Sequence, residues 1–249
     1  MKIFVANRNY VTWPRAMAEK FTGEGHEVIF LDNGSTYIPL LDWYKTCGLQ
    51  VIRLGNNGGH ALWTTDIIND LHEPFITSDP DYDLSMIPSD WDRVLLEGLR
   101  EFPHVNKFGF TWEEHRVPQE NPAYIEDEMY KYSEPNNPRY PKYPNGWVAA
   151  ANDSSFALQR PHSPDAITGI RKDFPYTGVH MPWHITLEPS ADPTKMYYLW
   201  DDEIAYYFLT CEHSSCTWGR MVKYDVMNKY LQLHNKTKEW LLNEYSVRK

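Results

Sequence analysis

Short apolar runs alternate with helix-like segments through the first hundred residues, and this alternation constrains the fold more than any other feature. Strand-like runs occupy residues 3–6, 27–31, 49–54 and 74–77. Segments with helix signals, such as apolar residues at helical spacing, a starting proline or a closing glycine, cover residues 12–23, 39–46, 55–69 and the stretch from 88 onward. This order predicts an α/β fold with a mainly parallel sheet, right-handed crossovers and helices on both faces.

A polar or glycine-rich turn follows each predicted strand. The turns contain Asn7 to Asn9, Asp32, Gly55 to Gly59, and Asp79 with Asp81. Ligands of open parallel sheets bind beyond the carboxyl ends of the strands. We therefore expect the four turns to meet at one edge of the sheet and to form a binding site there. Gly58 and Gly59 permit close approach of a ligand to the backbone, but their spacing matches neither the Rossmann fingerprint nor the P-loop.

The turn after the fourth strand carries two carboxylates, in the order Asp79-Pro80-Asp81. If the strand geometry continues through them, residues two apart point the same way and both side chains face one cation. Mg²⁺ and Mn²⁺ accept one or two carboxylates together with phosphate oxygens and waters. Such an ion offsets the charge that develops on a departing diphosphate. The alternative is an ordinary Asp-Pro-Asp turn.

The charge balance bears on the class of partner. The 249 residues include 34 acids and 24 bases, which gives a formal net charge of −10, and no run of Lys and Arg appears. A surface for DNA or RNA needs such a basic stripe, so nucleic acid is not an expected partner. A nucleotide remains compatible with this charge, because a metal ion neutralises a diphosphate locally.

Cysteine content and hydropathy bear on the compartment. Three cysteines fit a reducing environment better than a disulfide framework. Cys211 and Cys216 lack a second ligand pair at metal-binding spacing, so we expect them to be structural. The N-terminus lacks the apolar core of a signal peptide, and no apolar stretch is long enough to span a membrane. We expect a soluble cytoplasmic protein, with peripheral membrane contact left open.

The second half of the chain changes character. Residues 111–146 are rich in Pro and Tyr without periodicity, which is typical of a lid or binding loop and predicts an irregular acceptor-side segment. From Met196 onward the chain is aromatic-rich and then helical in pattern. We expect one domain over residues 1–190 and a C-terminal helical extension over 191–249. The ten Trp and 17 Tyr fit either core packing or sugar stacking.

Several of these segments, taken in order, resemble glycosyltransferase family 2, whose enzymes have the Rossmann-like GT-A fold. Residues 32–43 are similar to a bacterial, phage and viral branch of that family, and the resemblance covers roughly residues 2–185. The segments that carry it are Val5-Ala6-Asn7-Arg8-Asn9, Phe30-Leu31-Asp32-Asn33-Gly34-Ser35-Thr36, Gly55-Asn56-Asn57-Gly58-Gly59, Thr77-Ser78-Asp79-Pro80-Asp81, Asp153-Ser154-Ser155-Phe156-Ala157-Leu158, and Pro175-Tyr176 through His180-Met181-Pro182-Trp183.

The resemblance implies a nucleotide-sugar donor, by default linked to UDP, and a glycan, glycolipid or glycoprotein acceptor. It also implies Mn²⁺ or Mg²⁺ on Asp79 and Asp81, with Asp32 near the nucleobase or ribose. The turns and the resemblance together give the predicted donor-binding residues, which are Asn7, Asn9, Asp32, Asn57, Gly58 and Asp79.

Two further residues receive roles from the resemblance. Transfer with inversion needs a general base for the acceptor hydroxyl, and Asp153 matches that position; the alternative for Asp153 is a helix N-cap. His180 matches a late histidine that reaches the metal or the diphosphate, although an isolated histidine is often structural. His184 is a weaker candidate, and Trp112, Trp147 and Trp183 fit sugar stacking or core packing.

Two other functions stay open. A sugar-phosphate nucleotidylyltransferase also uses nucleotides and metals on a similar sheet, but the segment from Asn7 to Tyr10 lacks the glycine-rich loop that such enzymes carry. A catalytically degenerate domain would bind a nucleotide sugar or a glycan without turnover.

Overall fold

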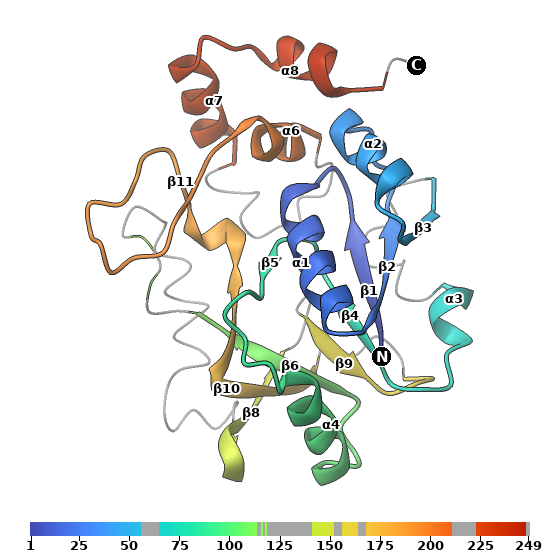
Figure 1. The fold of residues 1–249 in the computed structure, drawn as a ribbon. Helices are drawn as coiled ribbons and strands as arrows, with labels where there is room; N and C mark the ends of the chain where they lie inside the picture. The colour runs from blue at the N-terminus through green and yellow to red at the C-terminus, as the bar shows by residue number, and fades with distance from the viewer. Residues whose placement is uncertain are drawn as a thin grey trace.

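We analysed a computed structural model, which describes residues 1–55, 65–113, 116, 118, 141–151, 156–163, 168–210 and 223–247. Its fold is a mixed α/β sheet with helices packed around it (Figure 1). The helices and strands, in chain order, are β1 (Lys2–Asn7), α1 (Thr12–Gly23), β2 (Glu27–Asp32), α2 (Ile38–Thr46), β3 (Gln50–Arg53), α3 (Asp66–Asn69), β4 (Phe75–Ser78), β5 (Tyr82–Asp83), α4 (Trp91–Glu101), β6 (Lys107–Trp112), β7 (Lys142–Tyr143), η2 (Pro144–Gly146), β8 (Trp147–Ala151), β9 (Ala157–Gln159), β10 (Thr168–His180), η3 (Met181–His184), β11 (Ile185–Thr186), β12 (Tyr198–Leu199), α6 (Asp202–Thr210), α7 (Lys223–Leu233) and α8 (Lys238–Tyr245).

The central sheet has the strand order β3-β2-β1-β4-β9-β6-β10-β8-β7, and β5 pairs separately with β10. Strands β1 to β4 are mutually parallel, and β6 runs parallel to β10. The prediction of a mainly parallel α/β sheet flanked by helices is therefore confirmed. The sequence pattern does not predict β9, which runs antiparallel between β4 and β6, or the antiparallel strands β8 and β5.

Strand β1 is buried on both faces, as its continuous apolar run predicts. Ile3 and Val5 enter the largest core cluster, whereas Phe4 and Ala6 enter a second cluster on the other face. This alternation follows from the two-residue period of a strand. The polar residue that follows this apolar run, Asn7, is thereby held at the carboxyl edge.

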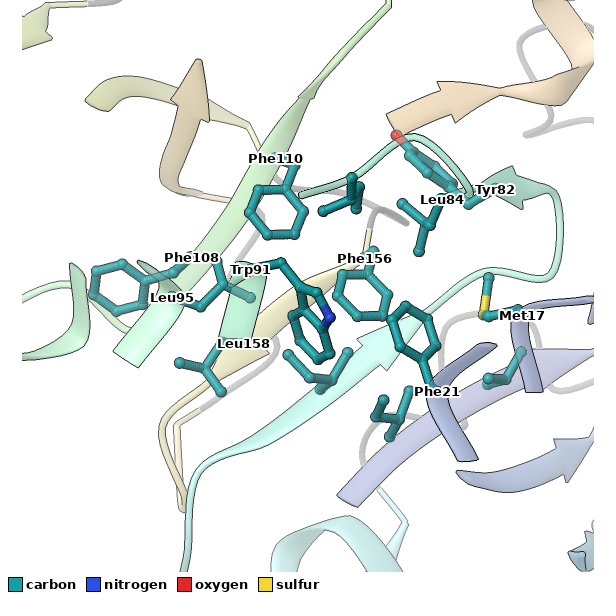
Figure 2. Packing of buried hydrophobic residues seen from close by; sticks show 14 of the residues in the cluster. Met17, Phe21, Tyr82, Leu84, Trp91, Leu95, Phe108, Phe110, Phe156 and Leu158 are labelled. Atoms are coloured by element: carbon teal, nitrogen blue, oxygen red, sulfur yellow. The ribbon is translucent and has the colours of Figure 1, made fainter. Parts of the chain in front are cut away.

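The largest core cluster contains most of the aromatic residues of the sheet region. Trp91 is fully buried at the start of α4, with ring centroids 5.0 Å from Phe21 and 5.2 Å from Phe156. Its indole N–H donates to Glu24 Oε2 over 2.8 Å. Figure 2 shows Trp91 beside Phe156 and Leu95 in the middle of this cluster. Trp147, which is also buried there, packs in the core rather than facing a ligand.

The C-terminal helices gather at the end toward which the arrows of β1 and β2 point (Figure 1). Glu203 of α6 accepts hydrogen bonds from the backbone N–H groups of Val11 (2.6 Å) and Thr12 (2.9 Å), and from the Thr12 hydroxyl (2.6 Å). The first N–H groups of a helix have no partner within it, so α6 supplies the cap of α1. Among the described residues, no helix combines the length and apolar composition needed to cross a bilayer.

A substitution at Gly98 tests how closely α4 packs against the sheet. A Cβ at this position would lie 2.5 Å from Trp147 Cζ2 and 3.0 Å from Phe108 Cδ1. We expect Gly98→Ala to lower the free energy of unfolding by about 1–3 kcal/mol, because an overfilled core must shift its neighbours. Urea titration followed by circular dichroism measures this change.

Gly23, in the last turn of α1, provides the matched control, since a Cβ there meets nothing within 4 Å. Gly23→Ala should leave stability unchanged or raise it by up to about 1 kcal/mol. Equal effects of the two substitutions would contradict the packing of Gly98.

Candidate functional site

The ends of β1 and β2 place two buried polar side chains next to each other. Asn7 and Asp32 are paired in the parallel register, and their side chains are inaccessible to solvent. The Asn7 amide nitrogen donates to the Tyr10 carbonyl (2.8 Å) and to Tyr44 Oη (2.9 Å). The amide oxygen of Asn7 has no protein partner. This oxygen is an acceptor that a ligand with a hydrogen-bond donor would satisfy.

Asp32 uses only one of its two carboxylate oxygens. Oδ1 accepts from the Ser35 backbone N–H (3.2 Å) and pairs with Arg53 Nε (2.8 Å). Oδ2 is buried without a protein partner. Burial, followed by the charge of Asp32, raises the pKa of the Tyr44 hydroxyl, so Tyr44 is neutral beside this carboxylate. Two hydrogen-bond acceptors at the ends of adjacent strands, Asn7 Oδ1 and Asp32 Oδ2, thus have no hydrogen-bond donor from the protein.

Asn9 holds the first two turns together. Its backbone is left-handed, with φ of 60°, a conformation that Asn tolerates better than most residues. Asn9 Oδ1 accepts from the N–H groups of Thr36 (2.7 Å) and Tyr37 (3.0 Å), and Asn9 Nδ2 donates to Thr210 Oγ1 of α6 (2.8 Å). Through these bonds, Asn9 stabilises the two turns. Its predicted contact with a nucleotide-sugar donor remains a prediction.

The two carboxylates after β4 lie on a turn rather than on a continuing strand, because β4 ends at Ser78 and β5 begins at Tyr82. The condition under which strand alternation would aim Asp79 and Asp81 the same way is therefore not met. Asp81 is almost buried, whereas Asp79 is half-buried. The Oδ1 atom of Asp81 has no protein partner.

Pairing of β5 with β10 brings Asp81 to His180. Tyr82 lies opposite His180 in the antiparallel register, and the Asp81 carbonyl accepts from the Met181 N–H over 2.9 Å. As a result, His180 Nε2 lies 3.7 Å from Asp81 Oδ2. A carboxylate and an imidazole from distant segments of the chain thus face each other at the carboxyl edge. Their predicted role as metal ligands remains a prediction.

Aromatic rings fix the plane of the His180 imidazole. The Trp112 ring is stacked on it, with centroids 5.9 Å apart and planes 22° apart. Trp183 meets it edge-on at 4.9 Å, and the Arg171 guanidinium lies 4.0 Å from the Trp112 ring centroid. Because of these contacts, the imidazole has little freedom to turn Nε2 away from Asp81. Trp112 and Trp183 contribute packing around a candidate ligand in this arrangement.

Within the described ranges, no three His, Cys, Asp or Glu side chains form a group able to hold a metal ion by themselves. Asp81 and His180 together could supply two ligands, and Asp79 lies on the same turn. A divalent ion that binds nucleotides takes only one or two protein carboxylates and completes its shell with phosphate oxygens and waters. The unused Oδ1 of Asp81 fits such an ion.

Arg8 is not among the residues that the sequence predicts for the site, although it lies between Asn7 and Asn9. Its Nε and Nη1 atoms are buried without a protein partner. Arg8 as a whole is half-buried. A partly desolvated guanidinium without a counter-ion is less stable than a paired one, so an anion at this position would stabilise it. From the sequence, Arg8 is only a cation directly after the first predicted strand. Its inaccessible nitrogens without partners are evident only in the structure.

Three predicted site residues lie outside the described residues. They are Asn57 and Gly58 of the glycine-rich turn, and Asp153, the predicted general base. Cys211 and Cys216 lie outside as well. The roles predicted for them remain predictions.

His184 has a structural environment. It is fully buried, and its Nδ1 lies 3.1 Å from the Met196 carbonyl oxygen, to which it donates when protonated there. Burial lowers the pKa of His184 from its ordinary 6.5 to about 4. Neutral His184 therefore stabilises the fold fully above pH 6.5, and this contribution is lost as the pH falls toward 4.

This pH dependence is testable with His184→Asn, which keeps a donor for the Met196 carbonyl but cannot be protonated. Between pH 7 and pH 4, the wild-type protein should lose roughly 3 kcal/mol more of its unfolding free energy than the variant. Urea titrations across that range measure the difference. His104→Asn, at an exposed position, is the control; an equal effect there would contradict the assignment to His184.

Comparisons with known proteins give little further identification. No protein-family model matches the sequence, and no curated protein matches it. Among solved structures, the chain is similar to CMP:2-keto-3-deoxy-manno-octonic acid synthetase complexed with CTP, with 11% sequence identity and a TM-score of 0.36. The similarity covers 68% of this chain and 69% of that chain. A similarity at this level identifies neither a substrate nor a reaction for this chain.

Proposed function

We propose that the chain is a metal-dependent glycosyltransferase that moves a sugar from a nucleotide-sugar donor to a glycan or glycoconjugate acceptor. The observation that carries the proposal is the Asp81–His180 pair, with Nε2 and Oδ2 3.7 Å apart at the carboxyl edge of the sheet. The resemblance of the segments around Asp32, Asp79 and Asp153 to glycosyltransferase family 2 supports the same function.

The metal would be held by Asp81 and His180, with Asp79 of the same turn as the third candidate. When bound, it supplies positive charge to the diphosphate that leaves the sugar. An imidazole ligand favours Mn²⁺ over Mg²⁺, since Mg²⁺ takes oxygen ligands almost exclusively. Trp112 and Trp183 keep the imidazole oriented by stacking and edge contact.

The nucleoside would bind at the ends of β1 and β2. Asn7 Oδ1 and Asp32 Oδ2 are both acceptors without protein partners, so they suit the N–H groups of a base or the hydroxyls of a ribose. Arg8 supplies a guanidinium for the phosphates, which it can bind through two parallel hydrogen bonds. These three residues divide the donor into a nucleoside half and a phosphate half.

The acceptor hydroxyl must lose its proton during transfer. Asp153 is the proposed base, on the strength of its match to the family pattern. Asp153 lies outside the described residues, so its role rests on the sequence.

A nucleotidylyltransferase is the second candidate, and Arg8 is the observation that favours it. An enzyme that joins a nucleoside triphosphate to a sugar phosphate must hold more negative charge than one that binds a nucleotide sugar. Arg8 suits that demand, because it is a half-buried cation directly after the first strand and two of its nitrogens are inaccessible and without a protein partner. The two functions differ in their products, which are a nucleoside diphosphate and pyrophosphate respectively.

The decisive assay separates these products. With Mn²⁺ and a panel of nucleotide sugars, we expect release of one nucleoside diphosphate, accelerated by the correct acceptor, and no pyrophosphate from triphosphate with sugar phosphate. Asp81→Asn should weaken Mn²⁺-dependent donor binding, measured by calorimetry, by about 10–100-fold, because it removes the charged ligand.

The control for Asp81→Asn is Asp42→Asn, which changes an exposed carboxylate of α2. Release of pyrophosphate would establish the second candidate instead. Metal-dependent donor binding without either product, across the full acceptor panel, would leave a degenerate binding domain. No nucleotide binding by a folded sample would overturn both enzymatic functions.

Arg8 gives a sharper test of the phosphate half of the site. Arg8→Gln should weaken binding of a nucleoside diphosphate by about 10–100-fold, because hydrogen bonds to charged groups contribute about 1.5–3 kcal/mol. Binding of the corresponding nucleoside should change little. Arg15→Gln, at an exposed position of α1 where Arg15 pairs with Glu19, is the matched control. A loss of equal size for nucleoside and diphosphate would show that Arg8 only supports the fold.

A further inference from the structure

Two histidines face each other at the end of the sheet opposite the candidate site. His72 Nδ1 lies 3.1 Å from His162 Nε2, and the two ring centroids are 5.1 Å apart. Both side chains are exposed. Neither residue belongs to the predicted donor or metal site.

The sheet itself brings the pair together. His72 precedes β4 and His162 follows β9, and these two strands are antiparallel neighbours in which Phe75 lies opposite Gln159. His72 lies three residues before Phe75, and His162 lies three residues after Gln159. Because the strands are antiparallel, the start of β4 lies beside the end of β9, and the two rings are close to each other.

The backbone of His162 contributes to the placement. Its φ is +56°, in the left-handed region that residues with a Cβ seldom occupy. Such a conformation persists only where its surroundings hold it. The pair is thus held from both sides, by the strand ladder and by a turn.

The distance between the nitrogens suits a shared metal ion. Metal–imidazole bonds are about 2.0–2.1 Å long, so two nitrogens 3.1 Å apart subtend an angle of about 100° at an ion that binds both. That angle lies between the octahedral and tetrahedral values. Without an ion, one ring donates a hydrogen bond to the other; with an ion, the shared proton moves to the outer nitrogen of its own ring through solvent. No net proton is lost when both rings are neutral.

We propose that His72 and His162 together bind one divalent transition-metal ion of the Zn²⁺, Ni²⁺ and Cu²⁺ class. Imidazole is a preferred ligand of these ions, whereas Mg²⁺ takes oxygen ligands and Mn²⁺ binds imidazole less strongly than they do. No third side chain joins the pair among the described residues, so water completes the shell. The ion would fasten the turn before β4 to the segment after β9.

This site is separate from the one proposed for the nucleotide sugar. Strand β4 runs from the His72 end toward Asp79 and Asp81, so the two sites lie at opposite ends of the same strand. The ligand sets also differ, because one is a pair of imidazoles and the other includes carboxylates. Failure of one proposal leaves the other untouched.

The test is calorimetric titration of the full untagged chain with Zn²⁺, Ni²⁺ and Cu²⁺, repeated for His72→Ala, His162→Ala and the double variant. Each single substitution should weaken one class of site by about a hundredfold, because two linked ligands bind far more tightly than one. The double variant should lose this class of site altogether, because neither imidazole remains. With Cu²⁺, the wild-type electron paramagnetic resonance spectrum should show coupling to two nitrogens, reduced to one in each single variant.

Two controls separate this site from other histidines. His104→Ala changes an exposed, isolated histidine between α4 and β6, and His180→Ala changes the imidazole of the candidate donor site. Both should keep the two-nitrogen spectrum and the wild-type affinity at the His72–His162 site. Unchanged binding in His72→Ala and His162→Ala, or equal losses in His104→Ala, would overturn the proposal. Melting temperatures without metal verify that each variant is folded.

Discussion

The burial of β1 on both faces, between two parallel neighbours, is the constraint on which the rest of the structure depends. A parallel strand in this position must have apolar residues on both sides, and Ile3 to Ala6 meet that need. The first polar residue after such a strand can only emerge at its carboxyl end. Because β2 and β4 are in parallel register with β1, Asn7 and Asp32 end level with each other, and the turn after Ser78 follows beside them. The positions of the polar residues at this edge therefore follow from where the apolar runs of β1, β2 and β4 end.

The C-terminal helices extend this constraint to the turns. Glu203 caps α1, and Thr210 receives a hydrogen bond from Asn9, so residues from α6 fix the chain directly after Arg8. Asp202 adds a second set of bonds within the extension, where it accepts from the hydroxyls of Tyr230 and Tyr245. A loop held at this many points costs little further entropy when a ligand orders it. Helix α6, which is distant in sequence, therefore holds the turn after β1 in place.

The sequence predicts the elements whose neighbours are close along the chain, and it fails where partners are distant. The runs at 3–6 and 27–31 become β1 and β2 within one residue at each end, because apolar runs bounded by turn residues are a local signal. Strand β5 has two residues and no periodicity, so its pairing with β10, which brings Asp81 to His180, has no local signal. The insertion of β9 between β4 and β6 is likewise long-range. Asp81 and His180 are recognisable as chemical candidates from the sequence, while Arg8 becomes one only when its burial is known.

Buried polar atoms without protein partners are not spread evenly over the described residues. Several occur where parallel strands end, at Asn7, Arg8 and Asp32 after β1 and β2, and at Asp81 and His180 beside β5 and β10. Exceptions such as His26 and Trp200 are single atoms at scattered positions. Each buried polar group left without a partner costs about 1–3 kcal/mol, and a charged group costs more, so a concentration of them at one edge is expensive for a fold of marginal stability. The atoms concerned also differ in kind, since acceptors at the ends of β1 and β2 stand next to a cation, and an acceptor stands next to an imidazole. The proposed ligand, a nucleoside diphosphate with a metal ion, carries hydrogen-bond donors, negative charge and a cation, and each of these would match one of these kinds of atom.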